Sequence, residues 1–347
     1  MPSSRRGAVL AASATALLLA LSTTACGGAD SGGEGKGGKV RVRIAYQAIP
    51  NADLVVKNQK LLEKALPDAE VSWVKFDSGG DVNTAVIAGS VDLGLLGSSP
   101  VTKGLSAPLD IPYKVLWIHD LIGDNEALVA QKDVASVAAL KGRKIATPFG
   151  STAHYSLLVA LESAGLKASD VTLVDLQPQD ALAAWQRGDI DAAYVWTPSL
   201  TELKKDGKVL VSSREIAAEG RPTADLGVVT DAFAAEHPEI VDAWLKAEDQ
   251  AVKLAKSDPA KAAVAIGAEL NLSPEEAREQ LAELVLLTAE EQRGAQYLGR
   301  PGAPGALAGN LYDAAVFLKG QKAIDAVPDR SVFEKGLAVK ELARVTG

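Results

Sequence analysis

The chain has 347 residues and a formal net charge of −8, which becomes −10 if Arg5 and Arg6 leave with a signal peptide. This length is enough for two domains, each with its own core. The acidic balance argues against nucleic acid as a partner and against electrostatic attachment to anionic lipid. With one cysteine, Cys26, and three histidines, we expect no internal disulfide, no metal site, no catalytic cysteine and no cofactor.

Residues 1–26 have the pattern of an export signal. Arg5 and Arg6 precede an uncharged run of mainly Ala and Leu that is too short to span a bilayer. The lone Cys26 after this run resembles the lipobox of bacterial lipoproteins, which implies an exported protein whose lipidated Cys26 anchors it to the outer face of the cell membrane. Thr23 departs from the lipobox, which usually has Leu there, so a plain signal peptide is the alternative.

Residues 27–38 are rich in glycine and contain no apolar residue larger than alanine. Such a segment cannot form a packed core, and we predict a flexible tether. The spacing from Gly33 to Lys39 fits a phosphate-binding loop, but Val40 stands where that motif needs Ser or Thr, and no strand precedes it. We therefore reject a nucleotide site there.

After the tether, short β-type runs alternate with helical stretches. This alternation predicts parallel sheets covered by helices, an α/β fold. The expected strands are 40–46, 71–76, 91–96, 115–118, 127–130, 144–147, 171–176, 192–196 and 226–229. The expected helices are 52–66, 82–88, one after 97, one through 161, and 238–256, 259–270 and 274–287.

Two loops at the carboxyl ends of expected strands combine glycine, hydroxyl side chains and the start of a helix, which together favour an anion. The first contains Ser98 and Ser99 after strand 91–96. The second contains Ser151, Thr152 and His154 after strand 144–147. The alternatives are ordinary N-caps for the hydroxyl residues and a structural hydrogen bond for His154.

Trp196 falls at the end of strand 192–196, where its ring can hold a cationic or apolar group or pack in the core. Glu126 and Asp225 lie where the chain is expected to cross between domains. Carboxylates there can accept charge-assisted hydrogen bonds from an ammonium group. Solvated loop acids are the alternative.

Several segments resemble the taurine-binding members of the sulfonate/nitrate/taurine group of periplasmic binding proteins, which serve ATP-driven importers. The run Trp-Gln-Arg-Gly-Asp-Ile-Asp from Trp185, followed by Tyr-Val-Trp, is specific for the taurine branch. The resemblance covers about 39–322, through segments 44–47, 75–79, 97–100, 125–129, 154–158, 176–178, 184–198, 206–210 and 314–318.

The resemblance implies the type II periplasmic-binding-protein fold, two α/β lobes joined by two hinge segments. Lobe 1 would be 39–124 with 223–347, and lobe 2 would be 125–222. It implies a sulfonate cradle from Ser98, Ser99, Ser151, Thr152 and His154, an amine pocket from Glu126, Asp225 and Trp196, and further contacts from Tyr46, Gln47 and Tyr194. Ala153 departs from a Thr in similar proteins, which would weaken an anion contact, and Gly227 departs from an aromatic, which would enlarge the amine end.

From this resemblance we expect a monomeric solute-binding protein. It would close on taurine and deliver it to an ABC permease and its ATPase. We expect neither catalysis nor nucleic-acid binding. Glu126 and Asp225 favour a ligand with a cationic group. The alternatives are another aliphatic sulfonate or a sulfate ester, an enzyme of the same fold (some relatives perform pyrimidine synthesis), and a sensory subunit.

Overall fold

The structure is a computed structural model that describes residues 39–346. Lys39–Gly347 forms one compact unit. The expected signal peptide, the lipidation site Cys26 and the tether 27–38 lie outside the described residues.

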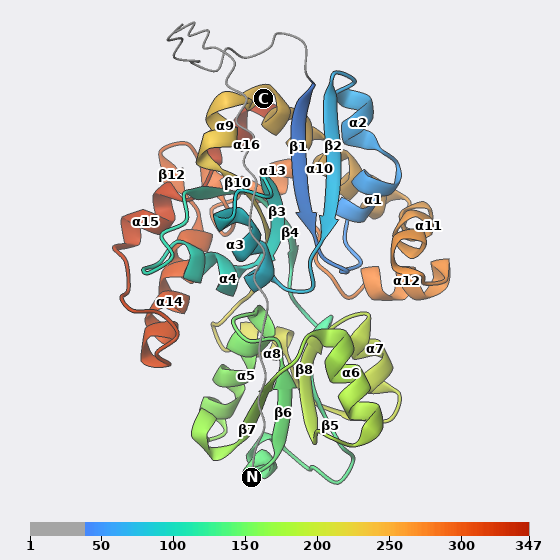
Figure 1. Ribbon diagram of the computed structural model, residues 1–347, viewed down its shortest axis with the longest axis vertical. Helices are drawn as coiled ribbons and strands as arrows, with labels where there is room; N and C mark the ends of the chain where they lie inside the picture. The colour runs from blue at the N-terminus through green and yellow to red at the C-terminus, as the bar shows by residue number, and fades with distance from the viewer. Residues whose placement is uncertain (1–38, 347) are drawn as a thin grey trace, which may run out of the picture. The chain divides into compact units, whose positions relative to one another are not determined.

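The first of two five-stranded sheets has the order β2-β1-β3-β10-β4 (Figure 1). Strand β1 pairs in parallel with β2 and β3, whereas β10 is antiparallel to both β3 and β4. Four of these strands were predicted to within two residues at each end, and β4 ends three residues beyond its prediction. The strands are β1 (Val40–Tyr46), β2 (Ala69–Lys75), β3 (Leu93–Gly97), β4 (Tyr113–Leu121) and β10 (Ala224–Thr230).

The second sheet repeats the same order as β7-β6-β8-β5-β9, with β5 antiparallel to its neighbours β8 and β9. Its strands are β5 (Glu126–Ala130), β6 (Lys144–Thr147), β7 (Thr172–Asp175), β8 (Ala192–Trp196) and β9 (Lys208–Ser212). No strand was expected at β9, an edge strand that begins with two exposed residues. The α/β fold is confirmed, but the expectation of parallel sheets is wrong in part: both five-stranded sheets are mixed, because β10 and β5 run antiparallel to their neighbours.

Helices cover both faces of each sheet (Figure 1). Around the first sheet, α1, α10 and α11 pack together, as do α3, α4 and α14. The helices are α1 (Asp53–Asn58), α2 (Leu61–Ala65), α3 (Gly79–Ile87), α4 (Ser98–Gly104), α5 (Thr152–Ser163), α6 (Pro178–Arg187), α7 (Ser199–Lys204), α8 (Ser213–Ala218), α9 (Asp231–Glu236), α10 (Pro238–Ser257), α11 (Pro259–Leu270), α12 (Pro274–Leu281), α13 (Ala289–Gln292), α14 (Ala306–Gly320), α15 (Arg330–Lys335) and α16 (Val339–Thr346).

Two predicted helices differ from the structure. The expected helix 52–66 is two helices, because Lys60 adopts a left-handed backbone with φ 53°. The expected helix 274–287 ends at Leu281, and Val285 then bridges Leu121 of β4. None of the helices in the described part of the chain is long and apolar enough to cross a membrane.

We call each sheet with its covering helices a lobe: the first lobe contains β1 and the second contains β5. The chain passes to the second lobe between β4 and β5, and returns between α8 and β10. The two crossings meet, since the backbone N–H of Ile122 donates to the carbonyl of Thr223 at 3.1 Å. The strand ends next to these crossings therefore come close together.

Candidate functional site

A narrow cleft lies where the strand ends of the two lobes meet the crossings. The first lobe contributes the end of β3 and the start of α3, and the second contributes the start of β5, the end of β8 and the start of α5. Twelve residues line it: Gln47, Ile49, Gly79, Gly97, Pro100, Ile122, Asn125, Glu126, Ser151, Thr152, Trp196 and Asp225.

Strand pairing positions three of these side chains. Glu126 is paired in register with Trp196, at the first residue of β5 and the last of β8. On β10, Asp225 lies between Gly97 of β3 and Asp120 of β4. The structure thus brings Glu126, Trp196 and Asp225 to one cavity, with carboxylates from both crossings.

Glu126 is held by hydroxyl groups. Thr152 Oγ1 donates to its Oε2 at 2.6 Å, and Ser213 Oγ donates to its Oε1 at 2.7 Å. The side chain is 1% exposed, and burial raises the pKa of Glu126 to about 7, although the hydroxyl hydrogen bonds act in the opposite direction.

Asp225 is also buried, and no lysine or arginine is among the groups that act on its pKa. Burial raises the pKa of Asp225 well above its usual range, and the neighbouring Asp120, Glu126 and Asp53 raise it further. Neither carboxyl group forms a salt bridge with another of residues 39–346, which makes this end of the cleft suited to a positively charged ligand group.

On the second lobe, Ser151 and Thr152 begin helix α5 at the edge of the cleft. Ser151 Oγ caps the helix, accepting from the N–H of His154 at 3.1 Å and donating to the Pro148 carbonyl at 2.7 Å. The N-cap alternative is therefore realised at Ser151. The hydroxyl of Thr152 is committed to Glu126.

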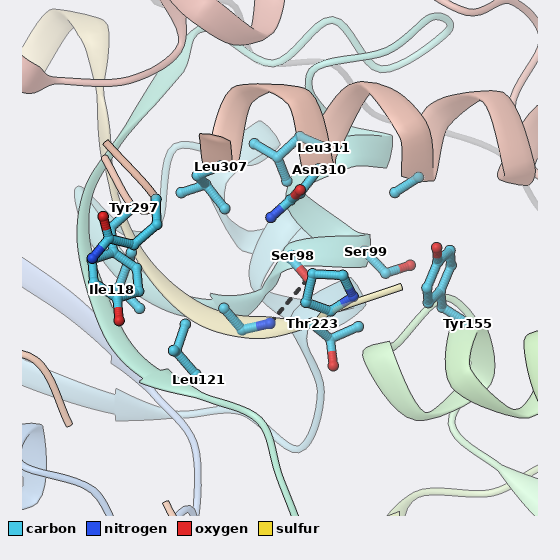
Figure 2. A pocket seen from close by; sticks show the side chains of 14 residues that line it. Ser98, Ser99, Ile118, Leu121, Tyr155, Thr223, Tyr297, Leu307, Asn310 and Leu311 are labelled. Atoms are coloured by element: carbon cyan, nitrogen blue, oxygen red, sulfur yellow. Dashed lines mark hydrogen bonds between the residues drawn. The ribbon is translucent and has the colours of Figure 1, made fainter. Parts of the chain in front are cut away.

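The side chains of Ser98 and Ser99 line a different cavity, together with Tyr155, Thr223 and Asn310 (Figure 2). Ser98 Oγ accepts a hydrogen bond of 3.3 Å from the N–H of Ala224. Ser99 Oγ has no hydrogen-bond partner among residues 39–346. Gly97 and Pro100 of the same loop line the cleft, whereas the side chains of both serines face the second cavity.

Three other expected site residues lie outside the cleft lining. His154 stacks on Phe149 with ring centroids 4.7 Å apart, and its Nδ1 accepts from the N–H of Gly150 at 3.0 Å. Burial and the nearby Lys103 lower the pKa of His154 to about 4, although Asp175 acts in the opposite direction. Tyr46 packs edge-on against Trp73, and Tyr194 is fully buried.

Gln47 lines the cleft as expected, and its Nε2 donates to the Leu95 carbonyl at 3.1 Å. Sequence reasoning did not select Gly79, Asn125 or Ile49. A Cβ atom at Gly79 would lie 2.7 Å from Cγ of Pro100, so a larger residue there would not fit. Gly79 is the last residue of segment 75–79, one of the segments that resemble the family, so the sequence did contain a signal for this position.

The two departures from the family pattern have different surroundings. A Cβ at Gly227 would lie 2.6 Å from Cη2 of Trp244 and 3.0 Å from Nε2 of His119. The expectation that Gly227 enlarges the amine end is therefore wrong, because these two rings occupy the space. Ala153 is fully buried in the apolar core of the second lobe and does not line the cleft.

No cluster of three or more His, Cys, Asp or Glu side chains suited to a metal ion occurs among residues 39–346. The cleft instead offers two carboxyl groups, an indole face, amide side chains and a helix start. Two α/β lobes with a polar cleft at their crossings define a two-lobed ligand-binding protein.

Residues 40–266 match the family model described as the substrate-binding domain of ABC-type glycine betaine transport systems. The chain belongs to this family of ABC-transporter substrate-binding domains. It is 44% identical to the taurine-binding periplasmic protein of Escherichia coli over 60% of this chain and 64% of that protein. It is 33% identical to a putative aliphatic sulfonates-binding protein of the same organism, over 53% of this chain and 60% of that protein.

These matches therefore span about three fifths of the length of both relatives. Among solved structures, the alkanesulfonate-binding protein SsuA from Xanthomonas axonopodis pv. citri, bound to MOPS, superposes with a TM-score of 0.70 at 23% identity. That superposition covers 86% of this chain and 98% of the other. It confirms the type II periplasmic-binding-protein fold.

Proposed function

We propose that this protein captures taurine in the cleft between its lobes and delivers it to an ABC importer. The observation that carries the proposal is the pair Glu126 and Asp225, two buried carboxyl groups from the two crossings that meet beside Trp196. A ligand with an ammonium group gives them a cationic partner. The taurine-binding relative at 44% identity supports the same choice.

For the sulfonate end we keep the cradle of Ser98, Ser99, Ser151, Thr152 and His154 as part of the proposal. A sulfonate stays anionic at physiological pH, so fixed N–H and hydroxyl donors suit it without proton transfer. Helix α5 begins at Thr152 and presents backbone N–H groups at the cleft edge. The side chains of Ser98 and Ser99 would have to turn from the second cavity, or bind through their backbone N–H groups.

We further propose that residues 39–124 with 223–347 move as one body against residues 125–222, and that ligand binding favours the closed arrangement. The closed, monomeric form would be recognised by a permease with its ATPase subunits. We also propose that Cys26 is lipidated and holds the exported protein at the outer face of the cell membrane, with 27–38 as a tether.

A second candidate ligand is an aliphatic sulfonate without an amine, because one relative at 33% identity is a putative aliphatic sulfonates-binding protein. Calorimetry of the purified protein against taurine, ethanesulfonate, a sulfate ester, nitrate and glycine betaine separates the two. The taurine proposal predicts micromolar or tighter binding of taurine and much weaker binding of ethanesulfonate. Tight ethanesulfonate binding without taurine binding would establish the second candidate.

A further inference from the structure

Three further carboxyl side chains are buried in the first lobe and do not line the cleft, and they interact: the charge of Asp120 acts on the pKa of Asp53, and the charge of Asp53 acts on the pKa of Glu248. Asp53 begins α1, Asp120 is on β4, and Glu248 is on α10. All three are at most 2% exposed. Asp225 connects them to the cleft, because it is paired with Asp120 across the strands and also lines the cavity.

The polar atoms around these carboxyl groups are incompletely satisfied. Asn51 is fully buried and its Nδ2 donates to Asp120 Oδ2 at 3.4 Å, but its Oδ1 has no partner among residues 39–346. The same holds for one oxygen of Asp53, one of Asp120 and both of Glu248. Buried oxygens of this kind favour a bound proton, since an ionised carboxylate without donors is costly.

The charged groups that face this cluster do not neutralise it. Lys57 on α1 makes an ion pair with Glu269 on α11, so its charge is shared with another acid. His119 on β4 lies 3.7 Å from Glu248 Oε2, but burial lowers its pKa to about 3 and the ring is neutral. Glu126, on the second lobe, adds a further acid.

We propose that Asp53, Asp120 and Glu248, together with Asp225, form a proton-binding site that releases a proton when the cationic end of a ligand enters the cleft. The inference rests on the proposed function for its ligand. An arriving ammonium favours loss of a proton from this set of interacting carboxyl groups, and it acts most directly on Asp225, which lines the cleft. Binding then exchanges a proton for a cation, and the buried cluster gains no net charge.

The directions of the pKa shifts agree with this exchange. Burial, together with neighbouring acids, raises the pKa of Asp53 to about 8 and that of Asp120 to about 7, although hydrogen bonds to both groups and the charge of Lys57 near Asp53 act in the opposite direction. Near neutral pH the ligand-free cluster therefore holds protons that a cation can displace. Taurine affinity should rise with pH, by up to about tenfold per pH unit for each proton released, while the ligand's own amine stays charged.

The first arm of the test uses the ligand-free protein. The raised pKa values mean that the folded state binds more protons than the unfolded state, so thermal stability should fall as pH rises from 6 to 8.5. Asp53→Asn and Asp120→Asn, neither of which lines the cleft, should each flatten this fall. Asp68→Asn, an exposed acid, is the matched control and should follow the wild type. Equal slopes in all four proteins would overturn the proton site.

The second arm measures taurine binding by calorimetry at pH 7.5 in phosphate and in Tris. Sulfonate buffers are avoided, because a protein of this fold binds MOPS. The difference in binding enthalpy between the two buffers should correspond to the release of about half to one proton per taurine bound. The release should fall by at least half in Asp53→Asn or Asp120→Asn, and ethanesulfonate should release none. Taurine heat independent of buffer overturns the exchange alone, whereas no taurine heat overturns both the exchange and the proposed function.

Discussion

The hydroxyl of Thr152 donates a hydrogen bond of 2.6 Å to Oε2 of Glu126, so a residue expected to hold a sulfonate is joined to a residue expected to hold an amine. The helix start of α5 and the carboxyl group at the start of β5 therefore form one polar surface. A ligand with both charges at a short separation would contact the helix start and Glu126 together.

Replacing Glu126 by Gln tests the amine role. The substitution keeps the shape and removes the charge that an ammonium would meet, and hydrogen bonds to charged groups contribute about 1.5–3 kcal/mol. We expect taurine affinity to fall by about 10- to 100-fold, and ethanesulfonate affinity to change by less than about threefold. Calorimetry with both ligands measures the difference, and Glu202→Gln on the exposed surface is the control. Equal losses of affinity for taurine and ethanesulfonate would show that Glu126 does not bind the amine.

Lobe closure is tested at Gly97. A Cβ there would lie 2.5 Å from Cγ2 of Thr152, which belongs to the opposite lobe. Gly97→Ala should hold the lobes apart and lower taurine affinity by at least about tenfold, with little change in the melting temperature. Thr152→Ser removes Cγ2 and keeps the hydroxyl bonded to Glu126, so the double variant should recover most of the affinity. A double variant no better than Gly97→Ala would show that this contact does not govern closure.

The indole of Trp196 is tested by two substitutions. Trp196 is 8% exposed and lines the cleft at the end of β8. A cation above an aromatic face contributes about 0.5–2 kcal/mol, so Trp196→Leu should weaken taurine binding by about 2- to 30-fold. Trp196→Phe retains a ring and should retain more of the affinity. A leucine variant that binds as well as the phenylalanine variant would assign Trp196 to core packing instead.

His119 predicts an acid limit to stability. Burial lowers the pKa of His119 to about 3, whereas an unfolded histidine titrates near 6.5. Below 6.5 the unfolded state therefore binds a proton at this histidine that the folded state does not, so His119 by itself lowers the free energy of unfolding as pH falls, opposite in sign to the contribution of the buried carboxyl groups. Between pH 6.5 and 5 this loss is about 1.5 kcal/mol. Denaturation of His119→Asn should lack it, with His237→Asn as the control; parallel pH curves for wild type and His119→Asn would contradict the prediction.

The positions of the main strands followed from the sequence because apolar runs report burial directly, whereas the order of the strands within each sheet was not predicted. Strands β1, β6 and β8 match their predicted bounds. Strand β9 was missed because its first residues are exposed, and the break at Lys60 was missed because a left-handed lysine has no sequence signal.

The residues of the cleft could be predicted from the sequence where they stand at the ends of strands, because strand ends of one sheet edge lie close together. Glu126, Trp196 and Asp225 end up together for that reason. Side-chain direction was not predictable: Ser98 and Ser99 face the neighbouring cavity, and Trp244, from a helix far along the chain, fills the space over Gly227. The carboxyl cluster of the first lobe joins α1, β4 and α10, and no local pattern connects them.

A crystal structure of the protein grown with taurine in a buffer without sulfonates tests the central claim most directly. The account predicts one taurine in the cleft between the lobes, with its nitrogen within hydrogen-bond distance of Glu126 or Asp225 and its sulfonate at the start of α5 or α4. A taurine bound elsewhere, such as in the cavity beside Asn310, or with its sulfonate against the two carboxylates, would contradict it.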